Sequence, residues 1–462
     1  MKALALGVTV ALGLLAAGQQ ARAKDYVYLL TGQSNSLGAV KGSPATPEQL
    51  ERYASAALLW NGNMVRDTGA LFETSPRWAV VAPQLPKYGN LCMGPEYGFA
   101  HMMMRHGWRS GKGDRLYILK ASLDGGGNSF WQVGRPAWSS MTESMKNAFA
   151  ALPREAKVQA LLYLQGESDK GVEITQAAER FLDLLARLQK VVRRGLRCAV
   201  VGECATWNAN EAADAKGNTT AACMYAMTRK KKNIGWVRTR DLTKITAGDN
   251  MGVHYDGKSQ ITIGARYAYA VAVLENLPFT PTRGDDAHAT LDTPAAWWGE
   301  KIPGAADVAT WDVASANAAD TLAKDVAWAG IAVADPFRGE VRISPAAAKK
   351  PVLHLGAEGL KAAEGSLTLL CAVECVADQT WRVGKGCKVA IGSAEAPVEL
   401  GGKACIRLQP EEGGELELHL RKEPATMWQL PEGVGPVRAT IGGQPAEFVK
   451  QGDFYKLVRR GS

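Results

Sequence analysis

Residues 27–38 read Val-Tyr-Leu-Leu-Thr-Gly-Gln-Ser-Asn-Ser-Leu-Gly. The first half is mostly apolar, as in a buried strand, and the second half is polar and lies between two glycines, as in a tight loop. This pattern places Ser34 at the turn after the strand, where a nucleophilic serine would sit. Ser34 would serve equally well as a loop serine that caps the next helix. A serine attacks only if a base and oxyanion donors are also present. Whether Ser34 is a nucleophile or a capping residue therefore depends on the residues in the rest of the chain.

Strand-like and helix-like segments alternate up to about residue 277. Short apolar runs lie at 26–30, 116–121, 158–164, 198–201 and 236–238, and amphipathic stretches lie at 95–106, 141–151, 174–193, 212–232 and 259–277. This alternation predicts a three-layer α/β/α domain with a parallel sheet. Because active sites of such sheets gather at the carboxyl ends of the strands, residues that follow the strands are the candidates for function.

The composition changes near residue 280. Residues 279–286 read Phe-Thr-Pro-Thr-Arg-Gly-Asp-Asp, which is typical of a linker. After them, helix-length patterns become rare, and short alternating segments separated by glycine turns follow one another. An all-β domain is expected here, as a β-solenoid or a sandwich. The predicted domains are a signal peptide at 1–23, an α/β domain at 24–280, a linker at 281–292 and an all-β domain at 293–462.

The amino terminus has the pattern of a cleaved export signal. Lys2 is followed by an apolar stretch at 3–17 and by Ala-Arg-Ala at 21–23. The mature protein is therefore expected to be secreted or periplasmic in a bacterium, and no later stretch has the length of a membrane span. The formal net charge of +8 is modest for a chain of 462 residues, and no nucleic-acid partner is expected.

Metal binding is not expected. None of the eight cysteines forms a Cys-x-x-Cys pair, and there is no His-Glu-x-x-His motif. Export would permit disulfides, but their pairing does not follow from the sequence. In the first domain, His101 and His106 fall on different faces of an apolar helix, which is typical of packed or surface residues.

Three later segments carry polar groups suited to a serine nucleophile. Residues 124–128 read Asp-Gly-Gly-Gly-Asn after a predicted strand, and glycines allow backbone N–H groups to approach an oxyanion. Gln165 follows another strand and offers a side-chain donor. His254 lies in a glycine-flanked loop before the last helix, where a general base could approach Ser34. The glycine run alone is also compatible with a flexible turn, and the segment of Gln165 with a surface turn.

The ordered set of these blocks resembles a known family. The blocks are Gly-Gln-Ser-Asn at 32–35, Lys-Ala at 120–121 with Gly-Gly at 125–126, Gln-Gly-Glu-Ser-Asp at 165–169, and His254 with Gly-Ala-Arg at 264–266. They resemble the sialate O-acetylesterase and carbohydrate esterase family six branch of the SGNH hydrolases, over roughly residues 25–276. The resemblance implies a flavodoxin-like fold, no cofactor and removal of acetyl groups from carbohydrate.

The resemblance also implies roles for individual residues. Ser34 would be the nucleophile and His254 the base. The oxyanion hole would consist of the N–H groups of Ser34 and Gly126, with Gly125 as the alternative, and the side chain of Gln165.

The third member of the triad departs from the wider superfamily pattern. An aspartate commonly stands three residues before the catalytic histidine, but that position is Met251. Glu167 is the preferred substitute because the resembling esterases carry a glutamate in the same block, and Asp249 is the alternative.

The second domain resembles the passenger-associated β-strand repeats of bacterial autotransporters. The resemblance rests on Trp-Trp at 297–298, Pro-Gly-Ala-Ala-Asp at 303–307, Leu-Gly-Ala-Glu-Gly at 355–359 and Gln-Thr-Trp at 379–381. It implies a right-handed parallel β-solenoid that acts as a spacer or accessory domain. Its tryptophans could form a sugar platform, although core packing is the expected use of most of them.

Two functions from different classes follow. The first is an exported serine esterase that removes O-acetyl groups from acetylxylan, sialic acid or a related glycan through an acyl-enzyme intermediate. The second is a non-catalytic glycan-binding or surface module on an esterase fold, which Met251 alone supports directly. An esterase with a lipid or aryl substrate is a variant of the first, but the chain lacks a long apolar lid-like stretch.

Overall fold

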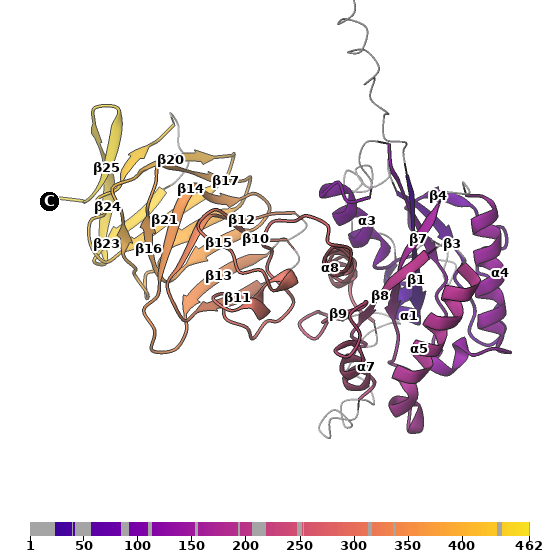
Figure 1. Cartoon of the computed structure of the whole chain (residues 1–462). Helices are drawn as coiled ribbons and strands as arrows, with labels where there is room; N and C mark the ends of the chain where they lie inside the picture. Colours follow the sequence, from indigo (N-terminus) through magenta and orange to yellow (C-terminus); the bar gives the residue numbers. More distant parts are fainter. Residues whose placement is uncertain are drawn as a thin grey trace, which may run out of the picture.

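The computed structural model describes residues 24–38, 40–41, 57–84, 92–109, 113–152, 156–192, 195–205, 219–246, 252, 254–312, 317–335, 339–431 and 437–461. The predicted signal peptide and the positions of Asp249 and Met251 lie outside these residues. The described chain forms a mixed α/β unit followed by an all-β unit (Figure 1).

A parallel-rich sheet forms the centre of the first unit. Its strands run in the order β4-β3-β6-β1-β7-β8-β9. Their bounds are β1 Asp25–Gly32, β3 Ala57–Asn61, β4 Trp78–Val80, β6 Arg115–Lys120, β7 Lys157–Leu164, β8 Gly195–Gly202 and β9 Ile234–Val237. Neighbouring strands pair in parallel except β3 and β4. The mixed α/β class with a mainly parallel sheet is thereby confirmed.

Strand β1 lies inside the sheet, and both of its faces are covered. Tyr28 and Leu30 belong to one apolar cluster, and Val27 and Leu29 belong to another, because successive side chains point to opposite faces. The first cluster includes residues of α3 and α8, and the second includes residues of α4, α5 and α7 (Figure 1). Burial on both faces explains why β1 reads as a continuous apolar run.

The helices of this unit differ in places from their predicted bounds. They are α1 Ser34–Leu37, α3 Glu96–Arg105, α4 Pro136–Ala150, α5 Val172–Val192, α7 Thr220–Thr228 and α8 Gly257–Glu275. Helix α4 begins before residue 141 because a proline suits the first helical turn. Helix α7 begins at Thr220 because Thr219 caps it, accepting a bond from the N–H of Ala222 at 3.0 Å, and the part of the predicted stretch before residue 219 lies outside the described residues. Of the helices that the structure describes, none is long and apolar enough to cross a membrane.

Short elements accompany both units. They are the antiparallel pair β2 Val40–Lys41 and β5 Cys92–Met93, and the 3₁₀ turns η1 Asn128–Trp131, η2 Pro294–Ala296 and η3 Trp298–Glu300, of which the last two lie at the start of the second unit.

The second unit is a 16-stranded sheet with two long series of parallel strands. One series is β10 Val308–Trp311, β12 Val326–Val333, β14 Val352–Ala362, β17 Gln379–Val383, β20 Cys405–Pro410 and β22 Met427–Gln429. The other is β11 Asn317–Leu322, β13 Glu340–Pro345, β15 Ser366–Leu369, β18 Lys388–Ile391, β21 Glu415–Leu420 and β23 Val437–Ile441. Strands β16 Ala372–Cys375 and β19 Leu400–Gly401 pair beside β14, and the hairpin β24 Gln444–Gln451 and β25 Phe454–Arg459 joins the ends of both series.

The interior of the second unit is apolar and aromatic. Trp311, Trp328, Trp381 and Trp428 are all buried. The rings of Trp381 and Trp428 meet edge to face with centroids 5.3 Å apart. These tryptophans therefore pack in the core, as expected of most of them, and do not form an exposed sugar platform.

Helices α3 and α8 carry the contacts to the second unit. The guanidinium of Arg105 lies 2.9 Å from a carboxylate oxygen of Asp312, which also accepts a bond from the hydroxyl of Tyr269. His101 Nε2 lies 2.8 Å from a carboxylate oxygen of Asp335. His101 is therefore a structural contact, in agreement with the expectation that it is a packed or surface residue.

Candidate active site

Ser34 lies at the carboxyl end of β1, where the chain turns into α1. The turn is tight because the N–H of Gln33 donates to the carbonyl of Leu164 on the neighbouring strand β7. Gly32 has a φ of +143°, and a Cβ there would lie only 1.9 Å from the carbonyl oxygen of Leu164. Glycine is therefore required at this position, and Ser34 is held beside the end of β7.

Gln33 and Gln165 join the turn of Ser34 to the glycine loop after β6 and to the loop after β7. Gln165 Nε2 donates to Gln33 Oε1 at 2.9 Å and to the carbonyl of Gly126 at 2.6 Å. Gln33 Oε1 also accepts from the N–H groups of Gly166 and Ser168, at 3.3 and 3.2 Å. The loops after β1, β6 and β7 thus meet at one edge of the sheet, as the parallel arrangement predicts.

The orientation of the Gln165 amide bears on its expected role as an oxyanion donor. The indole N–H of Trp131 donates to Gln165 Oε1 at 3.1 Å, and an indole nitrogen can only donate. This contact turns Nε2 toward Gln33 and Gly126, so both amide hydrogens are already engaged by the protein. In this arrangement Gln165 positions the two loops, and it does not present a spare donor to a substrate.

Asn35 connects the Ser34 turn to the loop of His254. Its Oδ1 accepts from the backbone N–H of Tyr255, the residue after His254, at 3.1 Å. Its backbone carbonyl accepts from Gln260 Nε2 of α8 at 3.2 Å. The carbonyl of His254 accepts from the N–H of Ile245. These bonds hold the half-buried His254 loop against the residue that follows Ser34.

Glu167 makes a different contact from the expected one. Its Oε1 accepts from Asn35 Nδ2 at 2.7 Å and from the N–H of Ala205 at 3.3 Å. Although the residue is only half-buried as a whole, its Oε2 is buried and has no hydrogen-bond partner among the described residues. Burial raises the pKa of Glu167, and the bond from Asn35 opposes that rise. Glu167 therefore reaches the His254 loop through Asn35 and Tyr255, and does not bond the imidazole itself.

The glycine loop is shaped by its own conformation and by Asp169. Gly125 has a φ of +65°, a conformation that favours glycine, and Gly126 is buried. The two oxygens of Asp169 accept from the backbone and side-chain N–H groups of Asn128, the backbone bond being 2.8 Å long. Burial raises the pKa of Asp169 to about 6. Asp169 thus anchors the end of the loop that presents Gly126.

A comparison with family models identifies the first unit. A family described as carbohydrate esterase, sialic acid-specific acetylesterase, matches residues 24–273. The chain belongs to this carbohydrate esterase family. The match covers more than half of the 462 residues, and it contains every site residue discussed above.

Two solved structures resemble this chain, each at 15% identity. One is a protein from Arabidopsis thaliana, with a TM-score of 0.40, covering 55% of this chain and 99% of that one. The other is a carbohydrate acetylesterase from Xanthomonas citri, with a TM-score of 0.35, covering 55% of this chain and 59% of that one. No curated protein sequence matches the esterase. The family assignment therefore rests on the sequence match.

A buried ion pair lies at the same edge of the sheet. Lys120 Nζ lies 2.7 Å from Glu96 Oε2, and neither side chain is exposed. Glu96 Oε1 accepts from the backbone N–H of Gly94 at 2.8 Å and from Gln84 Nε2 at 2.9 Å. Gln84 in turn accepts from Asn63. Since Lys120 is the last residue of β6, this network supports the start of the glycine loop.

Several residues of the site were not assigned roles from the sequence. Gln33 and Asn35 belong to the quoted motif around Ser34, but their partners lie more than 130 residues away. Asn128 and Trp131 follow the glycine run, and nothing in the sequence around them indicated which residues they would bond. A short motif shows which residues are present, whereas their partners depend on how distant loops meet.

Proposed function

We propose that the chain is an exported serine esterase that removes O-acetyl groups from carbohydrate. The observation that carries this proposal is the pair of hydrogen-bond links around Ser34. Gln33 ties its turn to Gln165, which in turn bonds Gly126, and Asn35 ties it to the loop of His254. Membership of the carbohydrate esterase family supports a glycan ester as substrate.

In the proposed reaction, Ser34 attacks the acetyl carbonyl carbon while His254 takes the proton of its hydroxyl. The N–H groups of Ser34 and Gly126 stabilise the oxyanion of the tetrahedral intermediate. The intermediate collapses to an acetyl-enzyme, and His254 returns the proton to the departing sugar hydroxyl. Water then attacks the acetyl group with His254 as base, which releases acetate and restores Ser34.

We assign Glu167 a positioning role in this reaction. Its bond to Asn35 orients the group that holds Tyr255 and thus the His254 loop. Asp249 is then the candidate for direct contact with the imidazole, and Gln165 the group that fixes the glycine loop. Separate substitutions Glu167→Gln and Asp249→Asn distinguish these roles, because loss of the direct partner of a catalytic histidine lowers kcat by about 10⁴-fold.

The fold assignments that go with this proposal are more specific than the mixed α/β and all-β classes. The order β6-β1-β7-β8-β9 corresponds to the flavodoxin-like order 2-1-3-4-5 with β3 and β4 added at one edge, which supports a three-layer SGNH domain. Successive strands of the second unit alternate between two parallel series, which supports a parallel β-solenoid acting as a spacer or accessory domain.

The pattern of residues 1–23 supports export and a secreted or periplasmic location. Fractionation of bacteria that express the full chain, with amino-terminal sequencing of the product, tests this part of the proposal. Cleavage after Ala23 is expected, and an intact amino terminus in the cytoplasm would contradict it.

Acetate release from acetylated xylan, O-acetyl sialic acid and 4-nitrophenyl acetate tests the activity. Ser34→Ala should lower kcat by at least about 10³-fold on every substrate that the unaltered protein hydrolyses. Ser36→Ala is the matched control, since it lies in the same helix and loses only a bond to the hydroxyl of Ser122. Glycan binding without any Ser34-dependent release would instead support a non-catalytic glycan-binding module.

A further inference from the structure

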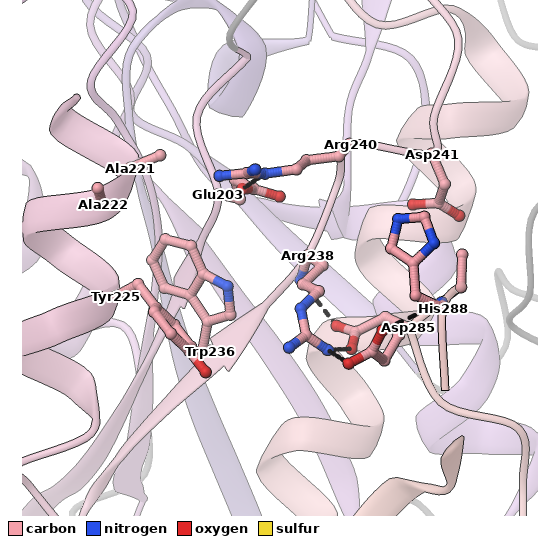
Figure 2. A pocket seen from close by; sticks show the side chains of 12 residues that line it. Glu203, Ala221, Ala222, Tyr225, Trp236, Arg238, Arg240, Asp241, Asp285 and His288 are labelled. Carbon is pink, nitrogen blue, oxygen red and sulfur yellow. Dashed lines mark hydrogen bonds and ion pairs between the residues drawn. The ribbon is translucent and has the colours of Figure 1, made fainter. Parts of the chain in front are cut away.

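A pocket of about 750 Å³ lies where the esterase unit meets the segment that leads into the second unit. Glu203 follows β8, Arg238 follows β9, and residues 285–288 belong to the connecting segment. The lining residues are Glu203, Ala221, Ala222, Tyr225, Trp236, Arg238, Arg240, Asp241, Asp285, Asp286, Ala287 and His288 (Figure 2). The volume is within the usual range of ligand sites, which often lie between domains.

One wall of the pocket is aromatic. Tyr225 of α7 and Trp236 of β9 are both half-buried, and their ring centroids lie 5.5 Å apart at an angle of 60°. Figure 2 shows the two rings on one side of Arg238, and Asp285 and His288 on its other side. The apolar C–H face of a sugar ring packs well on such surfaces, whereas its hydroxyl groups remain free to bond elsewhere.

Much of the remaining lining is charged, but its carboxylates are already paired with arginines. Arg238 lies 3.0 Å from Asp286 and 3.5 Å from Asp285. The remaining two pairs join Arg240 to Glu203 and Arg266 to Asp241.

Such pairs suit an uncharged ligand with many hydroxyl groups. A carboxylate has about four sites for accepting hydrogen bonds and can serve a hydroxyl and an arginine together. An anionic sugar would instead lie near four carboxylates, and the arginines that could attract it are already paired with those carboxylates. The lining therefore disfavours a negative ligand.

The pocket is connected to the Ser34 edge of the sheet through Tyr255. The hydroxyl of Tyr255 lies 2.7 Å from that of Thr239 and 3.5 Å from the carbonyl of Glu203, which lines the pocket. The backbone N–H of Tyr255 donates to Asn35, the residue after Ser34. Both sites thus lie along the carboxyl ends of the strands, and a chain of several sugars would be needed to occupy both.

We propose that this pocket binds an uncharged sugar unit of the glycan whose ester reaches Ser34. The inference rests on the proposed esterase function. It restricts the proposed substrate to a neutral oligosaccharide of more than one sugar unit. It also gives the connecting segment a function, since residues 285–288 form part of the wall.

Binding by Ser34→Ala protein tests the pocket apart from turnover. Titration calorimetry is carried out with xylohexaose, cellohexaose and mannohexaose as neutral probes and with a sialylated trisaccharide as the anionic probe. At least one neutral probe should bind, and adding Ala222→Trp, which fills the pocket from α7, should weaken that binding at least tenfold. Ala150→Trp, an exposed alanine at the end of α4, is the matched control and should have no effect.

Trp236→Ala is the second pocket variant. Tyr225→Ala replaces it if the Trp236→Ala protein does not fold. Its control is Trp138→Ala, another half-buried tryptophan, which packs beneath Arg187. Each pocket variant should lower kcat/KM for an acetylated neutral oligosaccharide, relative to that for 4-nitrophenyl acetate, at least tenfold.

The outcomes separate the two proposals. If no neutral probe binds, if the anionic probe binds more tightly, or if the pocket variants behave as their controls, the pocket inference is wrong. Any of these results with Ser34-dependent acetate release would leave the esterase function standing. Neutral binding that the pocket variants remove, without Ser34-dependent release, would support the pocket and overturn the esterase.

Discussion

The buried pair of Lys120 and Glu96 gives a sharp prediction about stability. Lys120→Met removes the positive partner and leaves Glu96 enclosed, with both side chains at 0% exposure. The remaining donors to the carboxylate are the N–H of Gly94 and the amide of Gln84, both of which are neutral. Removing one partner of a buried ion pair typically costs about 3–5 kcal/mol, because the other charge stays buried without compensation.

Urea unfolding measures this effect in the α/β unit when hydrogen exchange is followed in peptides of β1 and β6. With a urea dependence of about 3 kcal/mol per molar, the expected loss lowers the unfolding midpoint by about 1–2 M. Lys190→Met, at an exposed position of α5, is the control and should change stability by less than about 0.5 kcal/mol.

The double variant Glu96→Gln, Lys120→Met isolates the charge effect. It removes both charges and keeps most of the volume, so it should recover most of the stability lost in Lys120→Met. A single variant within about 1 kcal/mol of the unaltered protein would refute the reasoning. So would a double variant less stable than the single one, because the cost would then come from packing.

Three further predictions concern the site. Burial raises the pKa of Asp169 to about 6, so the folded state holds its proton more tightly than the unfolded chain does. The free energy of unfolding should therefore fall by up to ~3 kcal/mol as the pH rises from about 4 to about 6. Urea unfolding of Asp169→Asn should lack this fall. Gly32→Ala should cost about 3 kcal/mol or more in thermal unfolding, because its Cβ meets the carbonyl of Leu164. Asn35→Ala should lower kcat on 4-nitrophenyl acetate about 10- to 100-fold with little change in KM, since it frees the His254 loop from Glu167; an unchanged kcat would contradict the positioning role.

The regular elements of the first unit followed closely from local pattern. The predicted strands at 26–30, 116–121 and 158–164 correspond to β1, β6 and β7, because fully buried strands require continuous apolar runs. Strand β3 at Ala57–Asn61 was not predicted, and it extends the sheet beyond β6. Edge additions of this kind depend on pairing with a neighbour, which a short apolar run does not reveal.

The candidate site was predictable in its members and less so in its contacts. Gln165 bonds both Gly126 and Gln33, the neighbour of Ser34, so these predicted members lie near one another, and their catalytic roles stay predictions. The expected use of Gln165 as a free donor does not agree with its bonds to the protein, and the partner of Glu167 is Asn35. A glutamine or glutamate has several possible partners within reach, and only the packed loops select among them.

The sequence by itself determined where β1, β6, β7, β8 and β9 lie and which polar residues follow them, because both are properties of neighbouring residues. It also determined the family, since the short motifs and their order are local in the same sense. The tertiary structure decided which groups bond, since those contacts join loops as far apart as Asn35 and Tyr255. It alone also formed the pocket at residues 285–288, because two strand ends, a helix and the connecting segment must meet to enclose that volume.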